Sequence, residues 1–154
     1  WNRDLLVRGG FGHVDVARLI EGNVALQVFS AVTKVPWGQN YESNPADSDA
    51  LTTLVIAQRW PAQTYGSLRN RALYQAKKLE DFSRASDGRL RLIATASDLR
   101  AYLAERERNP GMTAGMLAVE GAQCLEGDIA NLDYLFAAGY RMIGLTHFFD
   151  NELA

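Results

Sequence analysis

The 154-residue sequence contains one cysteine, Cys124, and two histidines. A lone cysteine cannot form an intrachain disulfide or a thiolate metal cluster, which excludes a disulfide-stapled domain and a structural zinc finger. Cys124 also has no histidine close to it in the sequence, so the pattern gives little support to a nucleophilic thiol. The chemistry of the chain has to come from other side chains.

The sequence also lacks an excess of either charge and any long apolar run. Its 16 Lys and Arg residues stand against 18 Asp and Glu, a net charge of -2, so a surface built for phosphate contacts is not expected and nucleic acid is excluded as a partner. The longest apolar stretch, Val24 to Val32, is interrupted by Gln27 and Ser30 and is far short of the ~20 residues that cross a bilayer. We expect no membrane span in this segment.

Other absences concern motifs and targeting signals. Neither the Rossmann nor the P-loop glycine pattern occurs. The chain opens on Trp1 without an initiator methionine or a signal-peptide pattern, which indicates a mature or excised segment and favours a cytoplasmic location. With 47% hydrophobic residues and no internal repeat, residues 1–154 are expected to fold as a single domain with a sizeable core.

Apolar runs of strand length alternate with amphipathic stretches, a pattern typical of an α/β fold with a parallel sheet. Strands are expected at 24–32, 90–94, 112–119 and 141–145. Helices are expected to begin at Asp47 or Ser48, near Leu68, at Ser97-Asp98 and at Asp128. Residues 33–47 are dense in Pro, Gly and Asn and predict a long loop after the first strand.

Two polar residues directly follow strands of this predicted sheet. Glu120 ends the third strand and His147 follows the fourth, and the carboxyl ends of neighbouring parallel strands gather at one edge. A carboxylate there can bridge two divalent cations, and a neutral imidazole can be a ligand or polarise a carbonyl. Spacing alone equally allows Glu120 to be a turn or capping residue and His147 to be a structural histidine.

Other candidates are weaker. His13 and Asp15 have the His-x-Asp spacing of a metal-binding pair, but they precede an amphipathic stretch, which favours a turn or a helix start. Trp37 and Tyr41 could line a substrate pocket or pack on their own loop.

Several segments together resemble the membrane (renal) dipeptidase family, zinc dipeptidases built on a (β/α)8 barrel. The most specific are 117–121 (Leu-Ala-Val-Glu-Gly) and 139–147 (Gly-Tyr-Arg-Met-Ile-Gly-Leu-Thr-His), with Asn151 following; segments 12–30 and 94–99 also resemble the family. The resemblance covers nearly the whole chain and keeps the family's order and spacing.

This resemblance implies that Glu120 bridges two zinc ions and that His147 helps to hold the scissile group of a dipeptide. It also implies a partial TIM barrel, about the second to fifth strands with their helices, since a full barrel takes ~250 residues. The family's first His-x-Asp pair would lie before Trp1 and two later histidines beyond Ala154. One carboxylate and one histidine cannot hold two zinc ions, so the segment is expected to be inactive when isolated.

The expected function is hydrolysis of the peptide bond of dipeptides by a metal-activated water, in a protein that could form a homodimer. Two alternatives stay open. A related metal-dependent amidohydrolase could act on another amide or ester with the same residues. Alternatively, the segment could be a catalytically silent fragment that lacks the full metal site.

Overall fold

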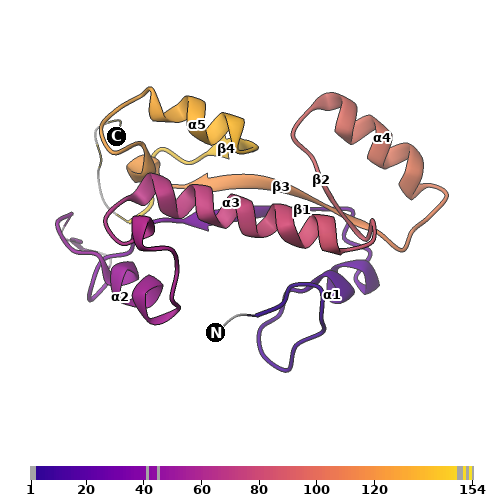
Figure 1. Ribbon diagram of the computed structural model, residues 1–154, viewed down its shortest axis with the longest axis horizontal. Coiled ribbons are helices and arrows are strands. Elements are labelled where there is room, and N and C mark those ends of the chain that lie inside the picture. The colour runs from indigo at the N-terminus through magenta and orange to yellow at the C-terminus, as the bar shows by residue number, and fades with distance from the viewer. Residues whose placement is uncertain (1–2, 41, 45, 149–150, 152, 154) are drawn as a thin grey trace. The chain divides into compact units, whose positions relative to one another are not determined.

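The computed structural model describes residues 3–40, 42–44, 46–148, 151 and 153 (Figure 1). Helices and strands alternate along the chain, as the sequence predicts. Their order is α1 (Val16–Glu21), β1 (Leu26–Val32), α2 (Ala50–Ala57), η1 (Ala62–Thr64), α3 (Leu68–Ala85), β2 (Leu90–Leu92), α4 (Ala96–Arg106), β3 (Thr113–Glu120), η2 (Ala122–Leu125), α5 (Asn131–Ala137) and β4 (Tyr140–Ile143).

The N-cap of helix α2 lies one or two residues later than the expected Asp47 or Ser48. Its N-cap is Asp49, whose backbone is extended and whose carboxylate accepts a hydrogen bond from the Leu51 amide. Asp47 and Ser48 remain in the preceding loop. Neither was distinguishable from Asp49 in sequence, because all three residues are of types that favour an N-cap.

Two further helix starts also differ from expectation. Helix α4 is capped by Thr95 rather than by Ser97 or Asp98, and Thr95 and Asp98 form a reciprocal capping box. Asp128 accepts a hydrogen bond from the Ala130 amide at 2.9 Å, so it closes a turn ahead of α5 instead of capping the helix. Aspartate serves both purposes, and only the backbone path separates them.

The strands form a four-stranded sheet in which β2 and β3 are parallel, with Leu90 opposite Thr113 and Leu92 opposite Gly115. The order is β1-β3-β2, and β4 also pairs with β3. Strand β1 therefore lies beside β3, whereas successive strands of a (β/α)8 barrel are neighbours. The α/β class with a parallel sheet is confirmed, and the partial barrel stays a prediction.

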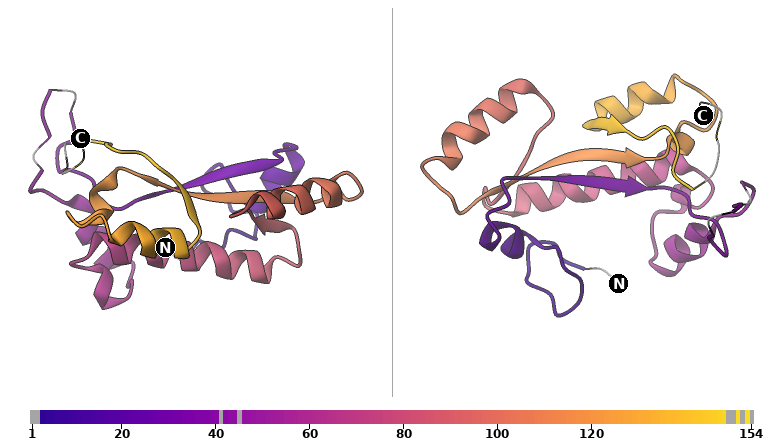
Figure 2. Two further views of the ribbon diagram at one scale, coloured as in Figure 1. Left: turned by 90° about the horizontal axis from the view of Figure 1, so that it is seen from above. Right: turned by 180° about the vertical axis from the view of Figure 1, so that it is seen from behind.

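The chain divides into two compact units, of which the first comprises residues 1–29 and 77–117. Within it, α4 connects β2 to β3 (Figure 2). Its core includes Ile93, Tyr102 and Met112, which are at most 7% exposed, together with Ala114. The Tyr102 hydroxyl donates to the Ala25 carbonyl, so this helix is held to the start of β1 by a polar bond as well as by apolar packing.

The second unit comprises residues 30–76 and 118–154 and contains the candidate site. Its buried side chains include Val119, Leu135 and Tyr140. The Tyr140 hydroxyl donates to the Ala72 carbonyl at 2.8 Å, and burial raises the pKa of this phenol above its ordinary value. The hydroxyl therefore stays protonated as a donor and ties β4 to α3.

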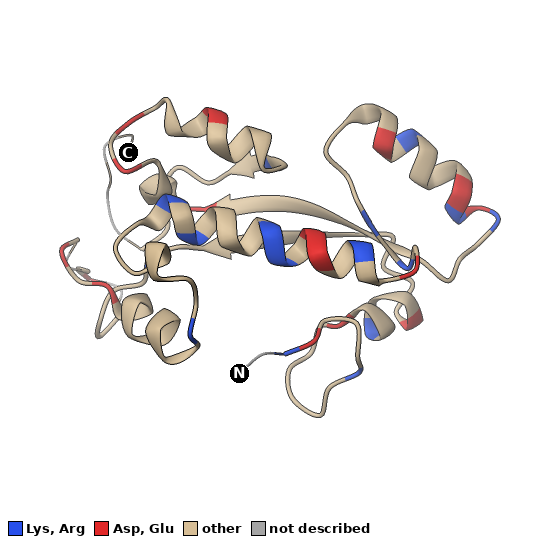
Figure 3. Cartoon of the chain, viewed as in Figure 1, with Lys and Arg blue, Asp and Glu red and all other residues tan. Residues whose placement is uncertain are grey.

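Charged side chains of both signs are mixed along α3 and α4 (Figure 3). Lys77 pairs with Asp81, and Arg84 pairs with Glu80, each at i,i+4 spacing on α3. Such exposed pairs each stabilise a helix by only about 0.3–0.5 kcal/mol. In the part of the chain that the structure describes, no helix combines the length and the apolar character that a membrane crossing needs.

Candidate functional site

Glu120 is the last residue of β3, the strand whose other residues are almost all buried. Its neighbour Val119 is 2% exposed, whereas the Glu120 side chain is 47% exposed. Gly121 follows with φ of 86°, a left-handed conformation that glycine adopts without a steric penalty. The chain thus turns directly after Glu120, which leaves an accessible carboxylate at the end of a buried strand.

His147 lies close to this carboxylate because the backbone after β4 keeps contact with the end of β3. The Gly144 amide donates to the Val119 carbonyl at 2.9 Å, and the Ala122 amide donates to the Leu145 carbonyl at 3.0 Å. Nε2 of His147 lies 3.3 Å from Oε1 of Glu120. The expectation that these two residues meet at one end of the sheet is therefore confirmed; their chemical roles stay predictions.

One nitrogen of the His147 imidazole, Nδ1, has no hydrogen-bond partner among the described residues. Its side chain is 20% exposed, and its ring packs against Phe148 with centroids 3.6 Å apart. Nδ1 is buried, and none of the described residues hydrogen-bonds to it. Buried polar atoms are usually hydrogen-bonded, so the described residues leave the polar contacts of His147 incomplete.

Carboxylate oxygen and imidazole nitrogen are both donors that zinc accepts. The 3.3 Å between Oε1 of Glu120 and Nε2 of His147 is an ion-pair distance. Across the described residues, however, no group of three or more His, Cys, Asp or Glu side chains could hold a metal. The pair fits part of a zinc site and needs further donors.

The His13-x-Asp15 pair is a helix start, as the neighbouring sequence favoured. Asp15 is buried and caps α1, with its carboxylate accepting from the Arg18 amide and pairing with the Arg18 guanidinium. Burial alone would raise the pKa of Asp15, but the bonds from Arg18 and Gly9 hold it below the ordinary value. This carboxylate is engaged in the fold, while His13 is exposed.

The remaining candidates from the sequence have structural explanations or lie elsewhere. Trp37 is 58% exposed, and its amide donates to Ser48 Oγ; Tyr41 lies outside the described residues. Cys124 is buried, and desolvation raises the pKa of its thiol to about 11, so it is unsuited to a nucleophilic role. Asn151 donates to the Leu145 carbonyl at 2.6 Å, beside the His147 segment.

Arg71, a buried residue of α3, binds both ends of the loop between β1 and α2 and was missed in the sequence. Its side chain is 1% exposed, yet its guanidinium makes five hydrogen bonds. The acceptors are the carbonyls of Thr33, Thr64 and Tyr65, the carboxylate of Asp49 and the hydroxyl of Thr52. In the sequence, Arg71 is a charged residue three positions after Leu68, at the edge of the apolar stripe of α3. That position was the signal that could have marked it as a buried cation.

Two of these contacts fix both ends of the long loop that follows β1. Thr33 is the first residue after β1, and Asp49 caps the helix at which the loop ends. Arg71 lies 2.9 Å from the Thr33 carbonyl oxygen and 2.6 Å from Asp49 Oδ2. Arg71 therefore anchors the loop at the residue where it leaves β1 and at the residue where it enters α2.

The Asp49 carboxyl predicts an acid-dependent stability. Partial burial raises its pKa, but hydrogen bonds from Thr52 and Arg71 outweigh burial and lower it from 3.8. A carboxyl with a depressed pKa in the folded state stabilises that state above its unfolded pKa, and this stabilisation is lost as pH falls through the folded pKa. Urea unfolding between about pH 5 and pH 2 should therefore show a shallower loss of stability in Asp49→Asn than in the unmodified protein.

The exposed Asp47 provides the matched control for this experiment, since it lies in the same loop. Asp47→Asn should keep the acid profile of the unmodified protein. An Asp49→Asn profile that stays parallel to that of Asp47→Asn over the whole range would contradict the assigned ion pair.

Comparison with known proteins agrees with this geometry. The sequence profile of the membrane dipeptidases, peptidase family M19, matches residues 5–154. The chain therefore belongs to the M19 membrane dipeptidase family. A search of curated protein sequences gave no significant match.

The chain resembles solved structures of metallopeptidases, among them the following two. One is the dipeptidase AC, a metallopeptidase of family M19, with a TM-score of 0.64 and 25% identity over 89% of this chain. The other, with a TM-score of 0.60 and 23% identity over 90% of this chain, is a metallopeptidase from Rhodobacter sphaeroides liganded with a phosphinate mimic of L-Ala-D-Ala. This chain spans 34% and 37% of those chains, about a third of their length.

Proposed function

We propose that the chain carries part of the active site of a zinc-dependent dipeptidase, which hydrolyses the peptide bond of dipeptides. One observation carries the proposal. In a chain of the M19 family, an accessible carboxylate and a half-buried imidazole lie 3.3 Å apart where two paired strands end.

Glu120 is the residue that would hold the metal. Its carboxylate has two oxygens, is half-exposed and stands at the end of β3, so it would be able to bridge two zinc ions. Bound zinc ions supply an activated water and polarise the substrate carbonyl. Glu120 would hold the two ions beside the substrate.

His147 is the residue that would hold the substrate. A neutral imidazole donates one N–H, and such a donor, placed against the scissile carbonyl oxygen, stabilises the negative charge that grows there during attack. The contact with Phe148 restricts the orientation of the ring. His147 therefore orients the peptide bond, while Glu120 carries the metal.

The rest of the zinc site must come from donors outside the described residues. A tetrahedral zinc ion takes about four ligands, and the pair supplies two candidate donors at most. We place the chain in a partial (β/α)8 barrel, whose exposed sheet edges further polypeptide would cover. The homodimer also stays a prediction.

The substrate class can be tested on the full-length protein loaded with zinc. Dipeptides should be hydrolysed, N-acylated amino acids should not, and a chelator should abolish the activity. Hydrolysis of N-acylated amino acids without hydrolysis of dipeptides would instead identify another metal-dependent amidohydrolase. Zinc binding to a polypeptide extended at both ends, but not to residues 1–154 alone, would support an incomplete site; binding to neither would support the silent fragment.

The division of roles predicts different outcomes for the two residues. His147→Ala should lower kcat for dipeptides by about 100-fold, the loss typical of removing one oxyanion donor, while zinc content measured by mass spectrometry stays unchanged. Loss of zinc from His147→Ala equal to that from Glu120→Ala would show that His147 is a ligand and would contradict this division.

A further inference from the structure

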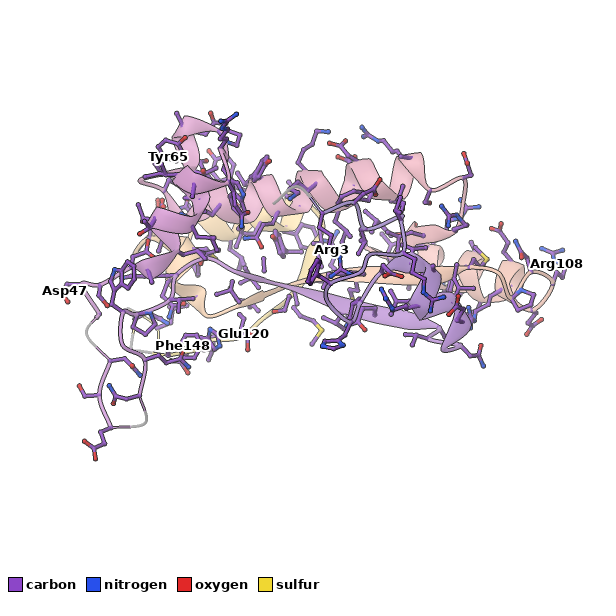
Figure 4. The ribbon with its side chains drawn as sticks, turned by 90° about the horizontal axis from the view of Figure 1, so that it is seen from below. Arg3, Asp47, Tyr65, Arg108, Glu120 and Phe148 are labelled. Atoms are coloured by element: carbon purple, nitrogen blue, oxygen red, sulfur yellow. The ribbon has the colours of Figure 1, made fainter. Side chains whose placement is uncertain are left out.

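The loop between β1 and α2, residues 34–48, is bonded to the segment that carries His147. Nδ2 of Asn44 donates to the Phe148 carbonyl oxygen at 3.0 Å, a contact between residues 104 positions apart. Phe148 directly follows His147 and packs against its ring. Figure 4 shows Phe148 close to Glu120, with the loop that contains Asp47 at the same end of the chain's second unit.

Asn44 is held in place by the loop itself. Its Oδ1 accepts a hydrogen bond from the Asn40 amide at 3.0 Å, and its Nδ2 donates to the Asn40 carbonyl at 3.0 Å. The side chain of Asn40 in turn accepts from the amides of Glu42 and Ser43. The second hydrogen of the Asn44 amide is thus free for one distant acceptor, the Phe148 carbonyl.

The loop is also anchored where it leaves β1 and where it enters α2. Arg71 binds the Thr33 carbonyl and the Asp49 carboxylate, while Lys34 donates to the Ala46 carbonyl. Because the loop is fixed at both ends, the bond from Asn44 restrains the Phe148 carbonyl. If the loop were not anchored, it would move together with Phe148 and the bond would not restrain the His147 segment.

From these contacts we propose that Asn44 is a positioning residue for His147. By fixing the carbonyl of Phe148, the residue that follows His147 and packs against its ring, Asn44 sets where the imidazole stands relative to Glu120 and to a bound substrate. The expected change in kcat rests on the proposed dipeptidase function. The expected change in the position of the His147 ring does not depend on activity.

The test compares two substitutions in the same loop of the full-length protein. Asn44→Asp keeps the acceptor for the Asn40 amide but places a carboxylate oxygen against the Phe148 carbonyl. Asn40→Asp introduces the same charge and loses only bonds within the loop, to the carbonyls of Gly38 and Ser43. Asn44→Ala removes the bond without adding charge and serves as the second variant if Asn44→Asp does not fold.

For each variant, kcat and KM are measured with a dipeptide, and the zinc content of the same preparation is determined. The ring resonances of His147 are recorded in a carbon–proton NMR spectrum. Both Asn44 variants should lower kcat by about tenfold, since small misplacements of a reacting group are costly. Zinc content should stay unchanged. They should also shift the His147 resonances, because the ring moves relative to Phe148. Asn40→Asp should stay within about twofold of the unmodified protein and leave these resonances in place.

Unchanged His147 resonances in the Asn44 variants, or equal effects of Asn44→Asp and Asn40→Asp, would overturn the inference. If the unmodified protein does not hydrolyse dipeptides but the Asn44 variants alone shift the His147 resonances, the proposed function fails and the positioning role stands.

Discussion

Glu120→Ala in the full-length protein is expected to lose its bound zinc and at least about a thousandfold in kcat/KM for dipeptides, the largest functional effect of any single change considered. The carboxylate stands at the end of β3 and is accessible. In the proposed site, its loss would remove the group that would fix the spacing of the two ions, whose chemistry would be to activate water and polarise the carbonyl. Zinc content and hydrolysis rates are measured on the same preparation.

Glu107→Ala is the matched control, since Glu107 is an exposed glutamate at the end of α4. It should keep both zinc and activity. Glu120→Gln retains the size of the side chain but not its charge, so it should bind zinc more weakly than the unmodified protein. Retention of full zinc content and activity by Glu120→Ala would refute the metal-binding role.

Arg71→Met is expected to produce the largest loss of stability, about 3–5 kcal/mol in the free energy of unfolding, as for breaking other buried ion pairs. Methionine fills much of the volume but donates no hydrogen bonds. The change would leave Asp49 without its cation and three buried or half-buried carbonyls without a donor. Unpaired polar groups of this kind are costly because they have also lost contact with water.

Urea unfolding at neutral pH measures this loss. Arg84→Met, on the same helix, is the control, because Arg84 is 66% exposed and pairs only with Glu80 and Asp81 among the described contacts. Its effect should stay within about 0.5 kcal/mol. A loss for Arg71→Met no larger than that for Arg84→Met would show that Arg71 does not organise the loop.

The sequence allowed prediction of those features that follow from local patterns. The alternation of apolar runs with amphipathic stretches predicted the order of strands and helices. The meeting of Glu120 and His147 followed from a general property of parallel sheets, in which the carboxyl ends of strands share one edge. The amphipathic stretch after Asp15 favoured a turn or a helix start there, and the structure has a helix start.

Features that depend on long-range contacts were not predictable. The pairing of β1 with β3 instead of β2 joins strands that are far apart in the sequence, and hydrophobic periodicity contains no information on such a choice. The roles of Arg71 and Asn44 depend on single hydrogen bonds to backbone carbonyls. Because every residue has such a carbonyl, no sequence pattern marks which one is the acceptor.

Anomalous diffraction at the zinc edge, from crystals of the full-length protein grown with zinc, tests the central claim most directly. We expect two zinc peaks, each ~2.0–2.2 Å from one carboxylate oxygen of Glu120, with the His147 ring facing the space beside them. Zinc peaks elsewhere in the molecule, with the Glu120 carboxylate free of metal, would contradict it.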